Sequence, residues 1–205
     1  MLTRRQLIAG LGSAAISGGI VSSTAAFTAT SSNSTASFTV VAPNYIELRA
    51  VNDPPIHVET NDDGIVTKLT PGNDTGLNEY AITRFEDIVE VHNVSSVALS
   101  GLYFDFVVES ESDTLSSSDA TEIEETLSVT AGSETLTTTG ESGDDLLAVS
   151  DAESAADGIL SSGEESVPFG VQVDLIPDSG ESSLSDLPDP NDFSATLRVI
   201  VETEE

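Results

Sequence analysis

The sequence predicts an all-β protein, an antiparallel β-sandwich of jelly-roll or immunoglobulin-like type with at most one short helix. Three observations lead to this prediction. Apolar and polar residues alternate in short runs, as in strands that bury one face. Clusters of Gly, Pro, Asn and Asp separate these runs and are typical of turns. No apolar stripe of helical period extends beyond two turns, so helices are not expected between the strands.

The clearest alternation runs over 193–202, where apolar residues occupy every second position from Phe193 to Val201. The same period of two predicts a further set of strands. They cover 36–41, 45–51, 65–69, 85–91, 102–109 and 169–175, with a weaker run at 123–129 that Glu125 interrupts. Runs 85–91 and 102–109 are joined by a short polar turn, which predicts a hairpin-like pair.

The remaining segments connect these strands. Residues 110–143 are rich in Ser, Thr, Gly and acidic residues, which predicts a long excursion from the sheet. The one plausible helix covers 144–156. Since no second core is apparent, we expect one sandwich domain over 42–205, preceded by an N-terminal β segment over 26–41.

The chain is strongly acidic, with a formal charge of −30 at pH 7, a pI near 4.1 and Lys68 as its single lysine. This charge excludes nucleic acid and anionic lipid as partners, because both repel a polyanion. Such a surface repels itself in dilute buffer and is screened at molar salt. The composition therefore predicts a halophilic protein, most simply archaeal. The absence of cysteine excludes disulfides, thiolate metal sites and thiol nucleophiles.

The N-terminus has the features of a signal peptide over 1–25. Arg4 and Arg5 precede an apolar stretch over 7–21, and small residues follow at 23–26. The apolar stretch is shorter than the roughly 20 residues of a membrane-spanning helix. The paired arginines resemble a twin-arginine export signal, and general secretion remains the alternative. We expect a secreted protein, at the cell surface or in a matrix, without a stable membrane anchor after cleavage.

Three segments together carry a family resemblance. Small residues run directly into a β-rich segment at 23–28, a strand-turn-strand pattern covers 85–103, and 159–174 joins a polar turn to an apolar strand. This combination resembles the secreted haloarchaeal relatives of the TasA/camelysin family, which are β-sandwich proteins of biofilm fibres and cell surfaces. One departure lies in the turn at 162–166, where Ser162 stands at a position that is commonly proline and an extra glutamate is present.

The resemblance implies assembly by donor-strand complementation between copies of this chain, or between it and a related subunit. The N-terminal segment of one subunit would then fill a strand position in its neighbour, a form of β-augmentation. The candidate donor lies within 26–41, where Phe27 and Ala29 plug one end and Ala36, Phe38 and Val40 alternate toward a core. The alternative is that this strand pairs within its own subunit. A head-to-tail contact would not close on itself and would give filaments.

Three N-glycosylation sequons begin at Asn33, Asn73 and Asn93, so the secreted chain is a candidate glycoprotein. A glycan on Asn33 would require the donor to lie on one side of that residue.

No catalytic or cofactor motif is present in the sequence. The two histidines, His57 and His92, are not part of an H-E-x-x-H pattern, although camelysin-type members are classed as metallopeptidases. There is no G-x-S-x-G elbow and no phosphate-binding loop. The acidic loops at 61–64 and 143–145 lack EF-hand spacing. We therefore expect a structural protein without enzyme activity, cofactor or metal. The first alternative is a monomeric adhesion or ligand-binding sandwich that presents the loops at 61–70 and 110–143, and the second is a camelysin-type peptidase.

Overall fold

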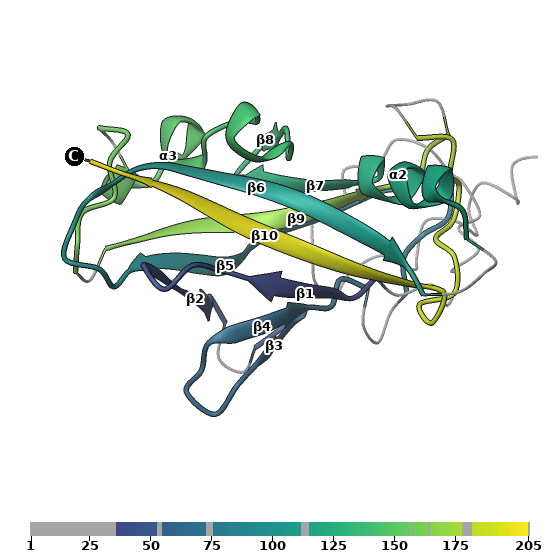
Figure 1. The fold of residues 1–205 in the computed structure, drawn as a ribbon, viewed down its shortest axis with the longest axis horizontal. Helices are drawn as coiled ribbons and strands as arrows, with labels where there is room; N and C mark the ends of the chain where they lie inside the picture. The colour runs from purple at the N-terminus through teal and green to yellow at the C-terminus, as the bar shows by residue number, and fades with distance from the viewer. Residues whose placement is uncertain are drawn as a thin grey trace, which may run out of the picture.

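The structure is a computed structural model that describes residues 36–52, 55–72, 76–111, 115–155, 157–163, 165–177 and 182–204. Two five-stranded sheets pack face to face, which confirms the predicted all-β sandwich (Figure 1). The strands are β1 (Phe38–Val41), β2 (Ile46–Ala50), β3 (Val58–Thr60), β4 (Val66–Leu69), β5 (Ile82–Asn93), β6 (Leu99–Ser110), β7 (Leu127–Ala131), β8 (Glu134–Leu136), β9 (Ser166–Asp174) and β10 (Phe193–Thr203). The helices are α2 (Ser117–Glu125), α3 (Leu146–Val149) and the 3₁₀ turns η1 (Gly140–Ser142) and η2 (Glu153–Ala155).

One sheet has the strand order β3-β4-β1-β10-β6 and the other has the order β2-β5-β9-β7-β8. We call them the β10 sheet and the β9 sheet. Neighbouring strands are antiparallel with one exception: β1 runs parallel to β10, with Phe38 opposite Ala195 and Val41 opposite Arg198. Its other neighbour, β4, is antiparallel. The first and last strands of the described chain therefore lie side by side within one sheet.

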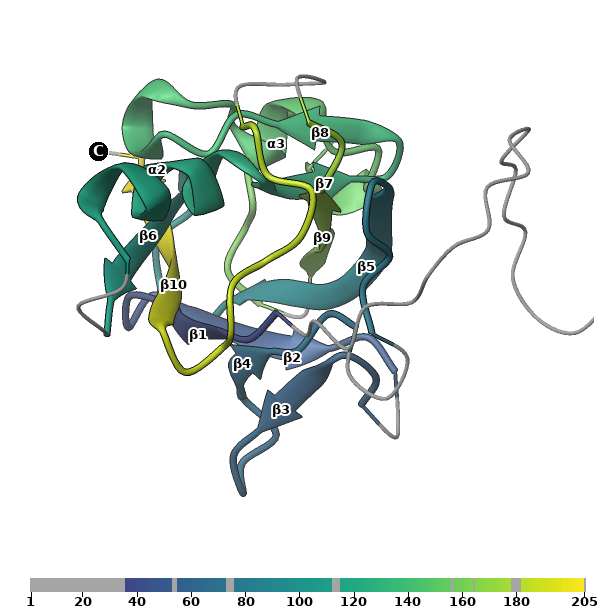
Figure 2. The same cartoon turned by 90° about the vertical axis from the view of Figure 1, so that its right-hand side faces the viewer.

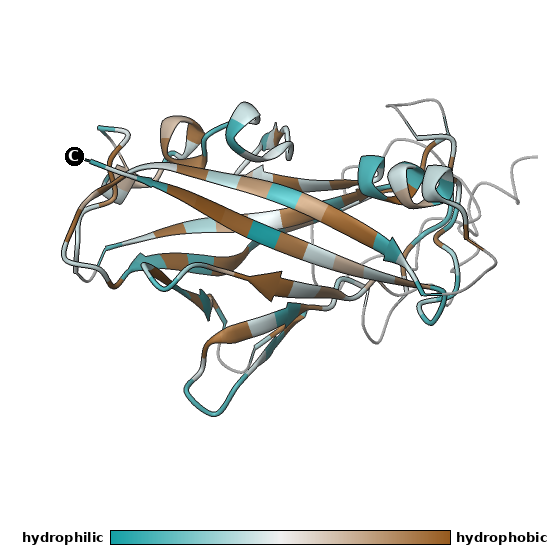
Figure 3. Ribbon diagram, in the orientation of Figure 1, coloured by the Kyte–Doolittle hydropathy of each residue, from teal (hydrophilic) through white to brown (hydrophobic). Residues whose placement is uncertain are grey.

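The core lies between the two sheets and is built by the alternation read from the sequence. Apolar and polar residues succeed one another along β6 and β10 in the hydropathy colouring (Figure 3). The Phe104 ring of β6 lies 4.9 Å from the Phe169 ring of β9, centroid to centroid, across the interface between the sheets. Phe38 of β1 packs edge-on against Phe106 at 5.6 Å. These contacts bury aromatic rings that contribute strongly to core energetics.

The predicted hairpin of 85–91 and 102–109 is wrong. β5 pairs with β2 and β9, whereas β6 pairs with β10 in the opposite sheet. The segment after Asn93 crosses from one sheet to the other instead of folding back within one. Period-two alternation identifies the buried face of a strand and does not identify its partner, so strands that follow one another in sequence need not pair.

The prediction of at most one helix is also wrong. α2 lies within the excursion at 110–143 and extends into the weak run at 123–129, of which only the last part belongs to β7. Its start is a capping box: the Asp119 backbone N–H donates to the Ser116 hydroxyl, and the Ser116 N–H donates to the Asp119 carboxylate. The segment predicted as one helix over 144–156 contains α3 and η2 separately. The three-residue strands β3 and β8 had no prediction.

Candidate interaction sites

The described part of the predicted donor segment forms β1, which lies inside the β10 sheet between β4 and β10 (Figure 1). Ala36 and Phe38 are fully buried, and Val40 packs partly buried against the core. Residues 36–41 thus occupy a strand position within their own subunit, as the alternative reading of the sequence describes. Phe27 and Ala29 lie outside the described residues, as do Arg4, Arg5, Asn33 and Asn73.

A short link joins β1 to the rest of the molecule. Residues 42–45 carry the chain from β1 in one sheet to β2 in the other. The Ile46 N–H donates to the Pro43 carbonyl at 3.2 Å, which closes a tight turn. The chain therefore passes from the β10 sheet to the β9 sheet directly after β1.

One end of the sandwich exposes an apolar cluster, which we call the Tyr45 end: Tyr45, Val94 and Val97, each 40–49% exposed. The Val94 N–H donates to the Tyr45 carbonyl, so the segments that carry these side chains are adjacent. The end of β10 also lies here, because Thr203 is opposite Leu99. Figure 1 shows this end at the left, with the C-terminus.

Asn93 fixes the crossing segment at the Tyr45 end. Its Nδ2 donates to the carbonyls of Val97 and Leu160, and its Oδ1 accepts from the backbone N–H and the hydroxyl of Ser95. The residue is only 1% exposed. Nδ2 is the atom to which an N-linked glycan is attached, and in the folded chain it is buried and fully hydrogen-bonded. The sequon alone shows nothing of this environment.

The opposite end, which we call the Tyr80 end, exposes Tyr80, Ile82 and Ile176, with Tyr80 65% exposed. Tyr80 has a φ of 53° and therefore lies in the left-handed region, which is unusual for an aromatic residue. Ile82 lies opposite Asp174 across β5 and β9, so an acidic residue adjoins this cluster. β1 begins at this end.

The outer edge of β6 is covered by two carboxylates. Asp145 Oδ1 accepts from the Leu102 N–H and Glu124 Oε1 accepts from the Val108 N–H, each at 2.8 Å. Between them, a bridge joins Asp105 to Thr139. Figure 2 shows α2 and α3 beside β6 on this side of the sandwich. Covering an edge in this way prevents unintended strand addition. On the other side, a bridge from Arg49 to Ile65 joins β2 to the start of β4.

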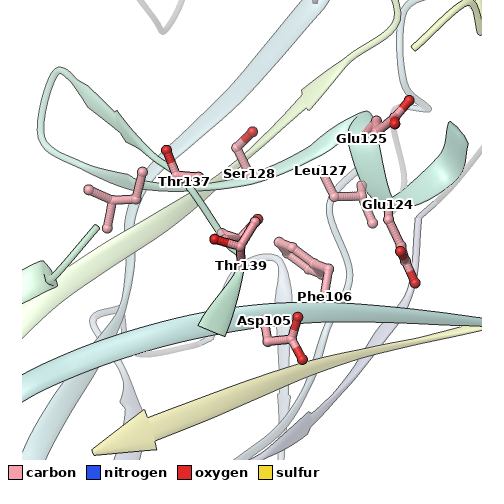
Figure 4. A pocket seen from close by; sticks show the side chains of 10 residues that line it. Asp105, Phe106, Glu124, Glu125, Leu127, Ser128, Thr137 and Thr139 are labelled. Carbon is pink, nitrogen blue, oxygen red and sulfur yellow. The ribbon is translucent and has the colours of Figure 1, made fainter. Parts of the chain in front are cut away.

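A cavity of about 490 Å³ lies between β6, α2 and β7 (Figure 4). Its lining combines carboxylates, hydroxyls and three apolar side chains. The lining residues are Asp105, Phe106, Glu124, Glu125, Leu127, Ser128, Leu136, Thr137, Thr138 and Thr139. Most of them belong to the excursion at 110–143.

In the part of the chain that the structure describes, Glu90, His92 and Ser166 lie close together without forming a nucleophile relay. Glu90 Oε2 lies 3.2 Å from His92 Nε2 and accepts from the Ser166 hydroxyl at 3.3 Å. The carboxylate therefore contacts both partners, whereas in a serine triad the imidazole lies between the hydroxyl and the acid. The ring of His57 packs edge-on against Phe85 at 4.5 Å. Within the described ranges, no group of three or more His, Asp or Glu side chains could hold a metal ion. No described helix is long and apolar enough to cross a membrane.

Backbone hydrogen bonds lower the pKa of three aspartates. The amide of Ser116 lowers the pKa of Asp119, that of Thr137 lowers the pKa of Asp144, and that of Asn191 lowers the pKa of Asp189. Burial, together with nearby carboxylates, raises the pKa of the Tyr103 phenol. All four shifts belong to caps, turns and a sheet face, and they gather at no common site.

Comparison with family models, curated proteins and solved structures found no match to this chain.

Proposed function

We propose that this chain is a secreted structural protein of a halophilic archaeon, the protomer of an extracellular fibre or matrix that assembles through its N-terminal segment. The resemblance to TasA/camelysin relatives suggests this role. The observation that carries the proposal is the distribution of charge: a chain with 36 acidic residues has no charged residue between Arg5 and Glu47. A neutral N-terminal segment can approach a second acidic copy without strong repulsion.

The position of β1 supports one part of that segment over the other as the donor. If β1 itself were exchanged, residues 42–45 would have to span from the neighbour's sheet to β2, a reach of about 17 Å at most. The start of β2 lies at the Tyr45 end, and the exit of the β1 position at Val41 lies opposite Arg198, midway along β10. So short a link would hold the two copies close together, and reciprocal exchange would close as a dimer.

Residues 26–35 offer a different geometry. They precede Ala36, whose N–H donates to the Pro71 carbonyl at the Tyr80 end. If β1 stays in its own sheet, this segment joins the described chain at the Tyr80 end and would be available to another molecule. Contacts between unlike ends propagate without closing, and they build a filament. We therefore assign the donor role to 26–35 and an internal structural role to 36–41.

Two deletions test this assignment in the mature chain at molar KCl, with negative-stain electron microscopy and analytical ultracentrifugation. The chain from residue 26 should form filaments. Deletion of 26–35 should leave a folded monomer that does not polymerise. Deletion of 26–41 should unfold the protein, because it removes Phe38 from the core. A mature chain that stays monomeric at molar salt would contradict the proposal.

The cavity beside α2 favours the alternative function, a monomeric sandwich that binds a ligand. Its carboxylate and hydroxyl lining suits a neutral or cationic polar molecule such as a sugar or a polyamine. Chemical-shift perturbation with such compounds, compared between the wild type and Thr139→Val, would reveal this activity. Perturbations confined to the cavity in a protein that forms no filaments would favour it over the fibre protomer.

A further inference from the structure

We propose that Asn93 is a glycosylation site of the unfolded chain only, so that attachment of a glycan to this residue and folding of the domain exclude each other. The inference goes beyond the proposed function and does not depend on it. It rests on the hydrogen bonds and the burial of the sequon Asn93-Val94-Ser95, which begins at the last residue of β5.

The modification would use the same atom that holds the fold together at this point. N-linked glycosylation joins the anomeric carbon of a phosphate-activated sugar to Nδ2, breaks the bond between that carbon and the phosphate, and releases one Nδ2 proton. In the folded chain, Nδ2 donates to the Val97 carbonyl at 2.8 Å and to the Leu160 carbonyl at 2.9 Å. The Ser95 hydroxyl, the other group that defines the sequon, contacts Asn93 Oδ1 at 2.8 Å. A glycosylated Nδ2 keeps one proton, so it loses at least one of its two bonds.

The surroundings of Asn93 leave no room for a sugar. The residue is 1% exposed, and Leu99 and Leu160 beside it are fully buried. These two leucines join the crossing segment to the segment before β9, because each backbone N–H donates to the carbonyl of the other at 3.0 Å. The Gly163 N–H donates to the Asn93 carbonyl from the same segment. Protein interiors are close-packed, so a sugar on Nδ2 would have to displace one of the two segments.

One of the two Nδ2 acceptors comes from a remote part of the chain. The bonds to Ser95 and Val97 are local, whereas Leu160 lies 67 residues beyond Asn93. Synthesis adds about 5–20 residues per second, so Leu160 follows Asn93 after roughly 3–13 s. The sequon is accessible during that interval and is closed once the segment that carries Leu160 has packed. The order of folding and glycosyl transfer therefore decides the state of the site, and a glycan on Asn93 marks a chain that has not reached the native fold.

Single-cysteine variants of the mature chain test the accessibility of the site, because the chain has no cysteine of its own. Asn93→Cys is compared with Val94→Cys, a matched control one residue away at a position that is 49% exposed. Both are treated with a glycosyl methanethiosulfonate, which attaches a sugar to the thiol through a disulfide. At molar KCl, we expect the thiol at position 94 to react at least about 100-fold faster than the thiol at position 93. In concentrated urea the two rates should agree within about threefold.

The glycosylated chains are then returned from urea to molar KCl. The chain with a sugar at position 94 should recover the thermal melt of its unlabelled form, and the chain with a sugar at position 93 should not. Equal labelling rates of the folded variants at molar KCl would overturn the proposal. Recovery of the native melt by the chain labelled at position 93 would overturn it as well.

Mass spectrometry of the chain made in cells does not depend on whether Asn93→Cys folds. Asp63→Thr creates a control sequon at the exposed Asn61, and the host is chosen because it glycosylates Asn61 of this variant. Folded protein should carry the glycan on Asn61 and none on Asn93. Adding Leu160→Pro removes the N–H that bonds to the Leu99 carbonyl, and it should raise the occupancy of Asn93 at least tenfold in the whole culture. A glycan on Asn93 of the folded protein, or no rise with Leu160→Pro, would contradict the proposal.

Discussion

The two ends of the sandwich expose apolar side chains to a similar degree and are nevertheless built differently. At the Tyr45 end, the segments that carry the cluster are uncharged and Asn93 anchors the chain with four hydrogen bonds. At the Tyr80 end, the loop over 182–192 carries acidic residues, Asp174 adjoins Ile82, and Tyr80 itself has a left-handed backbone. Acidic residues lie at both ends, since Glu202 and Glu204 of β10 adjoin the Tyr45 end. The two ends therefore differ in how their chain segments are held: the side chain of Asn93 fixes one, and the other contains a residue with a strained backbone.

Lowering the salt concentration should produce a larger difference in local stability between the two ends than any substitution. When KCl is lowered from molar to about 0.1 M, the screening length grows from roughly 3 to 10 Å and the acidic loops begin to repel one another. We expect the whole fold to lose stability and the Tyr80 end to open first. Hydrogen exchange should show the amides of Tyr80 and Leu175 losing protection at least about tenfold more than those of Val94 and Leu160. A melt that does not move with salt would contradict the halophilic interpretation, and equal exchange at both ends would contradict the comparison.

Regular alternation made most of the fold predictable. β6, β9 and β10 lie where the apolar residues recur at every second position, because burial of one face imposes that period. The partner of each strand was not predictable, since β5 and β6 have suitable buried faces for either sheet. α2 escaped detection because its charged and hydroxyl residues form no apolar stripe, and Ile123 is its one buried side chain. The capping-box pattern from Ser116 to Asp119 was the signal that could have located it.

Removing the anchor of the Tyr45 end should give the largest effect of a single substitution. Asn93→Ala removes four hydrogen bonds from a buried site, although the carbonyls of Val97 and Leu160 each keep a second donor, the Ser95 hydroxyl and the Leu99 N–H. We therefore expect a loss of about 2 kcal/mol in the free energy of unfolding. Urea titration at molar KCl measures it. Asn44→Ala, an exposed asparagine near the same end, is the matched control and should change stability by less than about 0.5 kcal/mol. Equal values for the two variants would show that the anchor does not hold this end.

The candidate site was less predictable than the fold. The sequence placed Ala36, Phe38 and Val40 on one face, and this face is buried, but periodicity cannot distinguish a strand of the same copy from a strand of a neighbour. Asn93 had the sequence of a glycosylation site and the surroundings of a core residue. Both distinctions depend on contacts between segments remote in the chain, which a local pattern does not contain.

Replacing each of the two exposed tyrosines with glycine should change the free energy of unfolding in opposite directions. Tyr80→Gly relieves a left-handed backbone that disfavours side chains, so we expect stability to rise by about 0.5–1 kcal/mol. Tyr45 has no such backbone, and Tyr45→Gly should lower stability by about 1 kcal/mol through added freedom of the unfolded chain. Thermal unfolding at molar KCl compares them. A loss of stability in both variants would show that Tyr80 contributes packing that outweighs its strain.

The smallest expected effects concern how stability depends on pH through two carboxylates, one near each end. Asp119 caps α2 near the Tyr80 end, and Asp144 closes the turn with Thr137 before α3, nearer the Tyr45 end. Both carboxyls have a pKa below the ordinary value of 3.8, so each stabilises the fold above that pH and loses its contribution as the pH falls further. Asp119→Asn and Asp144→Asn should each lower Tm slightly at pH 7, and the difference from wild type should shrink below pH 3.8. A difference that stays constant from pH 7 to pH 2.5 would show that the carboxylate charge is not what these caps use. Similar shrinkage for the two variants would show that these two carboxylates, unlike the exposed clusters, do not distinguish one end from the other.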